Sequence, residues 1–329
     1  MSELPSLSTR ARTLYDQRQY AELAALLTPL REQLVESAPY LAFYLADAWR
    51  RLGRQPAALE LVNDFAAASK RSGIARLELD RLNLEGMLRF ETGDIDGAEA
   101  SWRELLAEAD AEGNDDFVAR ANNNLGIIFT LDTRSAEAAV CYQRAIGAYT
   151  TIGSRRGLAQ SHQNLAITYR ELRQFDDADE HFTRAIRFAR ESESDDEVAR
   201  AEQERALLIY QARRDAQLAR VTVNRAIDRF STLNDPVGVS DATRVLAMIE
   251  LGEGDAQSAA QRGESALLSA RQVGHVLLQA ELLEVLAAAA RKQGAAEGAQ
   301  TFEAEASAAF ERVHASAWGQ QFRRTVQAL

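Results

Sequence analysis

Apolar residues recur along the chain at helical spacing, in stretches separated by short polar turns. Leu125, Ile128 and Phe129 fall on one side of a first stretch, and Ala145 and Tyr149 fall on one side of the next. Because residues three and four positions apart share a face of a helix, these stretches predict two amphipathic helices. The pattern therefore predicts a chain of helical hairpins.

A small residue that follows an apolar one marks the period of the hairpins. It recurs about every 40 residues, at Ala46, Gly86, Gly126, Ala166, Ala206, Ala247 and Ala287. A second small residue follows about 12 positions later, and its late arrival at Ala219 indicates one extra residue in a turn near Arg213 and Arg214. Small residues let two crossing helices approach closely, so the period predicts one helix crossing per unit.

The ends of the helices carry turn and capping signals. Gly153 and its counterparts in other units are residues that adopt the left-handed conformation that ends a helix. Ser194 and Glu197 have the spacing of a capping box, and Asp235 before Pro236 has that of a cap and a first helical residue. We expect helices to begin after Ser194 and Asp235.

Two of the units resemble tetratricopeptide (TPR) repeats. The residues that carry the resemblance are Leu125, Gly126, Phe129, Ala138, Tyr142 and Ala145, and in the next unit Leu165, Ala166, Tyr169, Ala178, Phe182 and Ala185. The period of 40 exceeds the usual 34, and the usual proline near the end of the second helix is replaced by Thr150 and Arg190. The units are thus similar to the longer repeats of kinesin light chain, of Rap-type bacterial peptide-sensing regulators and of the MalT sensor domain.

The resemblance implies an all-α fold, a right-handed α-solenoid of about eight antiparallel hairpins, because a single hairpin cannot bury its apolar face alone. We expect one domain over residues 1–329, with an irregular N-terminal hairpin at 6–36, seven repeats at 40–315 and a capping helix at 316–329. The last helix has an apolar stripe of Trp318, Phe322 and Val326. We expect this stripe to cover the last hairpin; the alternative is self-association, which would make a homodimer.

In TPR proteins the first helix of each hairpin lines the concave face, and the resemblance assigns ligand-facing positions before and after each small residue. The residues at these positions are Asn83, Met87, Phe90, Arg120, Asn123, Asn124, Ile127, Gln160, Gln163, Asn164, Ile167, Arg170, Arg200, Gln203 and Tyr210, together with Asp80, Thr130 and Glu204. Amide side chains can form hydrogen bonds with the main chain of an extended peptide, and arginines can form paired, charge-assisted hydrogen bonds with a carboxylate. The alternative is that the amides pair with one another and the arginines with neighbouring acidic residues.

The composition narrows the class of partner. The 329 residues include 38 basic and 49 acidic side chains, a net charge of −11, which disfavours nucleic acid and membrane surfaces. No apolar run approaches the roughly 20 residues that span a bilayer, and no signal peptide is evident, so we expect a cytoplasmic protein. The single cysteine, Cys141, excludes an internal disulfide.

Sequence patterns of catalysis are missing. The four histidines show no metal-ligand spacing, and no phosphate-binding loop is present. His162 and His181 fall on the two helices of one hairpin, where packed or surface histidines are more common than metal ligands. We therefore expect no enzyme activity, no metal and no cofactor.

The leading hypothesis is a non-catalytic scaffold that binds a peptide or a segment of a partner protein on its concave face. The first alternative is a sensor whose superhelix changes shape when it binds a peptide or small ligand. The second alternative is a structural protein that self-assembles through its last helix.

Overall fold

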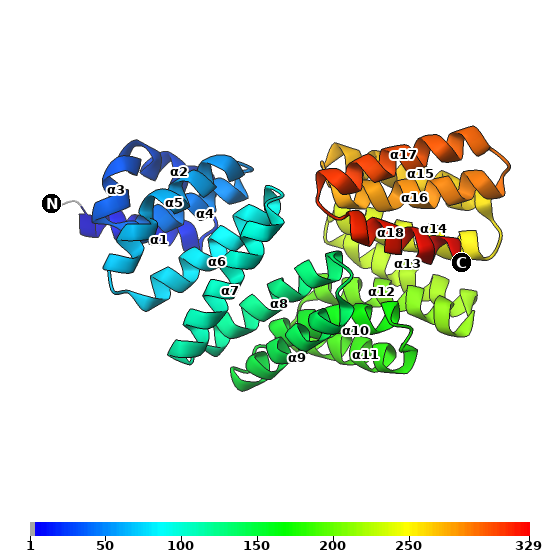
Figure 1. Cartoon of the computed structure of the whole chain (residues 1–329), viewed down its shortest axis with the longest axis horizontal. Helices are drawn as coiled ribbons and strands as arrows, with labels where there is room; N and C mark the ends of the chain where they lie inside the picture. Colours follow the sequence, from blue (N-terminus) through cyan, green and yellow to red (C-terminus); the bar gives the residue numbers. More distant parts are fainter. Residues whose placement is uncertain (1–3) are drawn as a thin grey trace. The chain divides into compact units, whose positions relative to one another are not determined.

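The computed structural model describes residues 4–329, and all regular elements in that range are helices (Figure 1). The first elements are α1 (Leu4–Asp16), α2 (Tyr20–Leu27), the short 3-10 helix η1 (Thr28–Leu30), α3 (Arg31–Ser37), α4 (Pro39–Arg51), α5 (Gln55–Arg71), α6 (Ala75–Glu91), α7 (Ile95–Glu112) and α8 (Asp115–Leu131). The others are α9 (Ser135–Thr151), α10 (Arg155–Glu171), α11 (Phe175–Glu191), α12 (Asp195–Arg213), α13 (Ala216–Thr232), α14 (Pro236–Gly252), α15 (Ala256–Gln272), α16 (Val276–Lys292), α17 (Ala296–Arg312) and α18 (Ser316–Gln327). The all-α helical repeat fold is confirmed, and within the described residues no helix is long and apolar enough to cross a membrane.

The helix ends confirm most of the predicted signals. Helix α12 has 19 residues where its neighbours have 17, and Arg214 follows it with a φ of 52°, so the extra residue does lie at this turn. Asp235 caps α14 by accepting a hydrogen bond from the Gly238 amide at 2.9 Å. The capping box is wrong, because the Ser194 side chain makes no cap hydrogen bond and pairs with the Ser192 hydroxyl at 3.0 Å.

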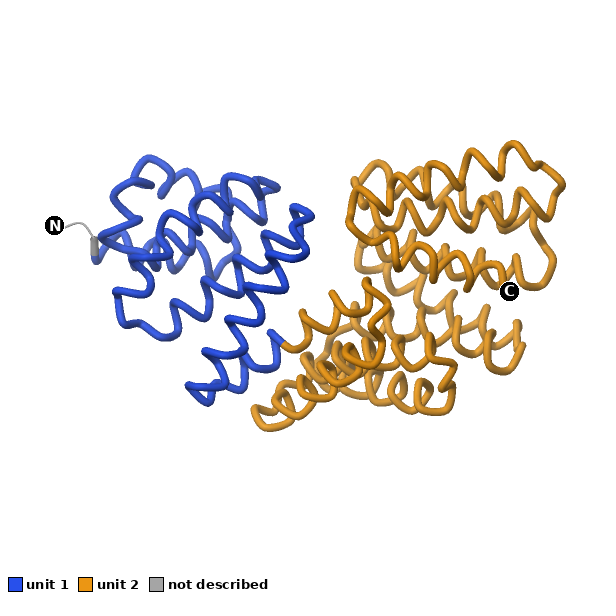
Figure 2. Tube along the Cα trace, in the orientation of Figure 1, with its two compact units in different colours: residues 1–121 blue, residues 122–329 orange. Residues whose placement is uncertain are grey.

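The chain divides into two compact units, residues 1–121 and residues 122–329, with the boundary inside α8 (Figure 2). In unit 1 the segment expected to be an irregular N-terminal hairpin has its second half split into α2, η1 and α3, and Pro29 lies in η1. The core of this unit is formed by buried residues of the helices α1 through α5, together with Leu84 and Leu88 of α6. The prediction of a single domain stays a prediction.

Unit 2 contains the hairpins α10/α11, α12/α13, α14/α15 and α16/α17, followed by α18 (Figure 1). The first helices α10, α12, α14 and α16 contact one another in order, and α16 contacts α18. In the part of unit 2 that the structure describes, the second helices α11, α13, α15 and α17 make no comparable contacts with one another. The first helices therefore form the inner face of this unit.

Candidate ligand-binding hollow

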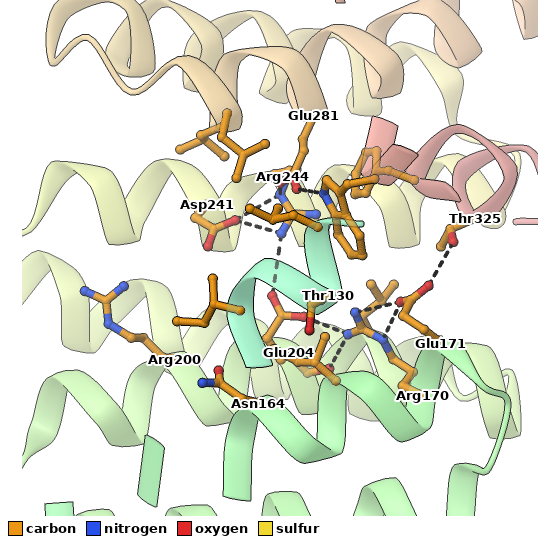
Figure 3. A pocket seen from close by; sticks show the side chains of 18 of the residues that line it. Thr130, Asn164, Arg170, Glu171, Arg200, Glu204, Asp241, Arg244, Glu281 and Thr325 are labelled. Carbon is orange, nitrogen blue, oxygen red and sulfur yellow. Dashed lines mark hydrogen bonds and ion pairs between the residues drawn. The ribbon is translucent and has the colours of Figure 1, made fainter. Parts of the chain in front are cut away.

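A hollow of about 280 Å³ lies on the inner face of unit 2 (Figure 3). Its lining comes from the last turns of α8, from Tyr142 of α9, from the first helices α10, α12, α14 and α16, and from α18. The apolar part of the lining includes Ile127, Ile167, Leu207, Leu278 and Phe322. Concave sites with apolar walls and a few convergent polar groups are the usual form of ligand sites.

Arg170, near the end of α10, is a buried cation held by two carboxylates (Figure 3). Its Nη1 donates to Glu204 Oε2 at 2.7 Å, and its Nη2 donates to Glu171 Oε1 at 3.2 Å. Burial by itself would lower the pKa of Arg170, but the charges of Glu204 and Glu171 outweigh burial and raise it. Arg170 is therefore a permanent charge that already has its partners.

Arg244 on α14 is surrounded by three carboxyl groups. Its Nη2 lies 2.8 Å from Asp241 Oδ1 and 3.5 Å from Glu204 Oε1, and its Nε lies 3.2 Å from Glu281 Oε2. Because Glu204 also binds Arg170, the two arginines and their partners form one continuous network across α10, α12, α14 and α16. Such networks fix the positions of the helices that contribute to them.

Glu281 lies at the far end of this network, beneath α18. Burial raises the pKa of Glu281 to about 7; Arg244 opposes this rise, and Asp241 adds to it. Its Oε1 accepts a hydrogen bond from Trp318 Nε1 at 2.7 Å. The Glu281 carboxyl therefore gains and loses its proton near neutral pH.

The lining holds more carboxyl groups than guanidinium groups. The carboxyl groups are those of Glu171, Glu204, Asp241 and Glu281, and the guanidinium groups are those of Arg170, Arg200 and Arg244. Arg200 also lies 3.6 Å from Asp235, outside the lining. Each of the three arginines has an acidic neighbour in the chain itself. For Arg170 and Arg200, this is the alternative arrangement that the sequence left open.

Helix α18 forms one wall of the hollow and packs on its own unit. Phe322 and Val326 are buried in the core of unit 2, and Trp318 packs against the same core. Both oxygens of buried Glu284 on α16 bind the Arg323 guanidinium, at 2.6 and 2.9 Å. The predicted capping helix is confirmed, whereas self-association through the same three residues stays a prediction.

Several predicted concave residues meet in the lining of the hollow. These are Ile127, Asn164, Ile167, Arg170 and Arg200, with Thr130 and Glu204 beside them. They come together because the period of 40 residues repeats the same face of α8, α10 and α12 around the inner side of the unit.

The predicted amides nearby bind groups of the same chain. Asn164 Nδ2 donates to Asn123 Oδ1 at 3.2 Å, and Gln160 Nε2 donates to Glu197 Oε1 at 2.6 Å. Gln163 lies on the same helix and is partly buried. Asn124 lies on α8, is partly buried and has a polar interaction of its own.

Two predicted residues of α12 are buried outside the lining. Gln203 is buried, and its Nε2 donates to Asp241 Oδ2 at 2.7 Å. It thereby holds in place one of the carboxylates that bind Arg244. Tyr210 packs so closely on α14 that a Cβ atom at Gly252 would lie 2.3 Å from the Tyr210 hydroxyl oxygen. Both side chains join the first helices to each other.

The remaining predicted residues belong to unit 1. Met87 packs against the core of that unit, and the Phe90 ring lies 6.0 Å from the Trp102 ring. Arg120 Nε donates to Asp116 Oδ1 at 3.0 Å. Asn83 is partly buried and has a polar interaction of its own.

Three residues of the hollow, Asp241, Arg244 and Glu281, were not predicted from the sequence. A signal for them is nevertheless present, because Asp241 and Arg244 lie six and three positions before Ala247, and Glu281 lies six positions before Ala287. The positional rule that selects residues on α10 and α12 therefore also selects these three on α14 and α16.

The two histidines of the α10/α11 hairpin do approach each other. His162 Nδ1 and His181 Nδ1 lie 2.8 Å apart. Burial, assisted by His181, lowers the pKa of His162 to about 3, and burial also lowers the pKa of His181. Over residues 4–329, no group of three or more histidine, cysteine or acidic residues is arranged to hold a metal ion.

The arrangement of tandem hairpins defines the fold as a TPR-like helical solenoid. No protein-family model matches the sequence. No curated protein matches it either.

Three solved structures illustrate the likeness of the fold. The apo form of RapI is 10% identical with a TM-score of 0.71, and the match covers 83% of this chain and 99% of that one. The Rap conjugation gene regulator of the plasmid pLS20, in complex with the Phr* peptide, is 14% identical with a TM-score of 0.60, covering 94% and 95%. A STAND protein with a tetratricopeptide repeat sensor from Pyrococcus horikoshii is 14% identical with a TM-score of 0.63, and this chain, matched over its full length, spans 49% of that protein.

Proposed function

We propose that unit 2 binds a peptide, or a segment of a partner protein, in the hollow on its inner face, and that the protein is a non-catalytic scaffold. The observation that carries the proposal is the hollow itself, about 280 Å³ with apolar walls and a charged floor. The similarity of the fold to a Rap regulator that is in complex with the Phr* peptide supports it.

The charges of the lining favour one kind of ligand. Arg170 and Arg244 are each enclosed by carboxyl groups, so neither offers an unneutralised charge to an acidic ligand. The lining holds one more carboxyl group than guanidinium groups, which disfavours acidic segments relative to neutral or basic ones. We therefore expect the bound segment to be apolar with a neutral or basic side chain at the floor.

A substitution that fills the hollow tests the proposal. Ile167→Trp adds bulk to the wall without changing the charge, and Ile152→Trp makes the same change at an exposed position outside the lining. Both variants and the original protein are used to capture partners from cell extract, which are identified by mass spectrometry. A synthetic peptide from each captured partner is then titrated calorimetrically.

A partner lost by Ile167→Trp and retained by Ile152→Trp is the expected result. Equal capture by both variants, with equal affinity for the synthetic peptide, would reject binding in the hollow. A captured segment rich in acidic residues would reject the charge argument and leave the hollow as the site.

A sensor function is the second candidate, because two distant segments of unit 2 meet at the hollow. Gln321 Nε2 of α18 donates to Glu171 Oε2 of α10 at 3.3 Å, across 150 positions of sequence. A ligand between these helices would change how α18 and α10 approach each other. Small-angle scattering with the synthetic peptide tests this: a smaller radius of gyration supports a sensor, and an unchanged profile at saturation rejects it.

A further inference from the structure

A second hollow in unit 2 is lined by arginines and lies away from the inner face. It is open, has a volume of about 480 Å³, and is formed by α11, α12 and α13. The arginines that line it are Arg187, Arg190, Arg205 and Arg225, and its carboxyl groups are those of Glu191 and Glu202. Arginines are thus twice as frequent as carboxylates in a chain whose net charge is −11.

Glu202 is the buried centre of this arrangement and is poorly satisfied. It is 2% exposed, and its Oε2 accepts no hydrogen bond. Guanidinium nitrogens of Arg190, Arg225 and Arg229 lie 3.5, 3.8 and 3.4 Å from its oxygens. These distances exceed the roughly 2.7–2.9 Å of a charge-assisted hydrogen bond, so Glu202 draws three guanidinium groups together without occupying their donors.

The donors of the cluster remain available to a ligand. Among the described residues, Arg187, Arg190 and Arg225 make no hydrogen bond, whereas Arg205 Nε is bound to Asp179 Oδ1 at 2.7 Å. The nearest acidic partner of Arg187 is Glu191 at 3.7 Å, and Glu191 also pairs with Arg155 at 3.0 Å. Several cations gathered around one carboxylate leave an excess of positive charge, which an anion would neutralise.

We propose that this cluster of Arg187, Arg190 and Arg225 is a binding site for a single phosphate monoester group. A phosphate monoester carries a charge of about −1.5 to −2 and three acceptor oxygens, and arginines recognise it through paired N–H donors. A polyanion such as nucleic acid fits less well, because the cluster is small and the chain around it is acidic. This site is separate from the hollow of the proposed function. Its three arginines lie on the second helices α11 and α13, whereas that hollow lies on the inner face formed by the first helices.

The test measures binding of a labelled acetyl-Gly-phosphoSer-Gly peptide by fluorescence polarisation at low salt, with the unphosphorylated peptide and inorganic phosphate as comparisons. The binding variant is Arg190→Ala with Arg225→Ala, whose side chains are 62% and 57% exposed. The matched control is Arg271→Ala with Arg291→Ala, which removes the same charge from α15 and α16. Circular dichroism verifies that both variants are folded.

We expect the phosphorylated peptide to bind and the double variant to weaken it about tenfold or more, because hydrogen bonds to charged groups are strong. Glu202→Gln is expected to increase the affinity, since it removes the anion that competes for the arginines. Inorganic phosphate that displaces the peptide at equal concentration would identify a free anion as the ligand, and displacement only at a large excess would identify a phosphorylated partner.

Binding of equal strength to the phosphorylated and unphosphorylated peptides would overturn the proposal. An equal loss in the Arg271→Ala, Arg291→Ala control would also overturn it, because the effect would then be one of net charge. So would an unchanged or weaker affinity in folded Glu202→Gln.

Discussion

Gly126 on α8 lies so close to the Tyr142 ring on α9 that a Cβ atom at this glycine would be 2.5 Å from Tyr142 Cε1. Carbon atoms in contact normally lie about 3.5–4.0 Å apart. The same relationship recurs 40 residues earlier, where a Cβ atom at Gly86 would be 2.4 Å from Trp102 Nε1. In these two units the glycine is therefore required by a large aromatic side chain 16 positions later.

Gly126→Leu tests this packing. The added side chain cannot coexist with the Tyr142 ring, so the two helices must separate, and we expect the free energy of unfolding to fall by roughly 3 kcal/mol. Chemical denaturation measures the loss. Gly147→Ala on α9 is the control, because a Cβ there meets nothing within 4 Å, and replacing a mid-helix glycine by alanine stabilises by about 0.5–1 kcal/mol. Equal effects of the two substitutions would contradict the packing argument.

The ion pair between Arg323 and Glu284 is expected to hold α18 on α16. Glu284 is 2% exposed and binds Arg323 through both oxygens. Arg323→Ala leaves that buried carboxylate without its partner, which costs about 3 kcal/mol, and we expect α18 to detach first. Amide hydrogen exchange of residues 316–327 measures this detachment.

Two variants verify that the unpaired charge causes the effect. Arg324→Ala, at an exposed neighbouring position, is expected to change stability by less than about 0.5 kcal/mol. Glu284→Gln combined with Arg323→Ala is expected to recover part of the protection. Fast exchange in the Arg324→Ala variant would show that α18 is held by other contacts.

Glu281 is expected to make the protein less stable as pH rises toward neutrality. Its pKa is raised by burial to about 7 in the folded protein from an ordinary value of 4.5. Between these two values the folded state binds a proton that the unfolded state has released, so stability falls as pH increases through this window. The Glu281 carboxyl should make the free energy of unfolding on the order of 3 kcal/mol larger at pH 5 than at pH 8, as measured by chemical denaturation.

Glu281→Gln isolates this contribution, since the amide keeps the shape and does not titrate. The variant is expected to gain stability relative to the original protein as pH rises from 5 to 8. Parallel pH profiles for the two proteins would show that the Glu281 carboxyl does not titrate in this range.

The pair of His162 and His181 is expected to make the protein less stable as pH falls, which is the opposite of the effect of Glu281. Burial lowers the pKa of His162 to about 3, and the pKa of His181 is also lowered. Unfolded histidine has a pKa near 6.5, so protonation favours the unfolded chain, and the stabilising contribution is lost as pH falls below about 6.5. Nuclear magnetic resonance measures the titration: the His162 ring should not titrate between pH 8 and pH 6, and normal titration of His162 would refute the burial of this pair.

The hydrophobic period and the small residues determine by themselves that the chain forms stacked helical hairpins. Ala206 and Ala219 reveal the extra residue at the turn that contains Arg214, because they are 13 positions apart where the corresponding residues of the other units are 12 apart. The position of Asp235 before Pro236 determines the start of α14. Both are local signals, and local geometry follows from local sequence.

Only the tertiary structure decided which polar residues meet on the inner face. Arg170 and Glu204 are 34 positions apart, and Gln321 and Glu171 are 150 positions apart, so their pairing depends on how the repeats stack and where α18 packs. From the sequence, the arginines were predicted to bind a carboxylate of the ligand. In the fold they are surrounded by carboxyl groups of the chain itself. The repeat spacing determines the face of the helix on which a side chain lies. The distances between stacked helices determine which oppositely charged side chain it pairs with.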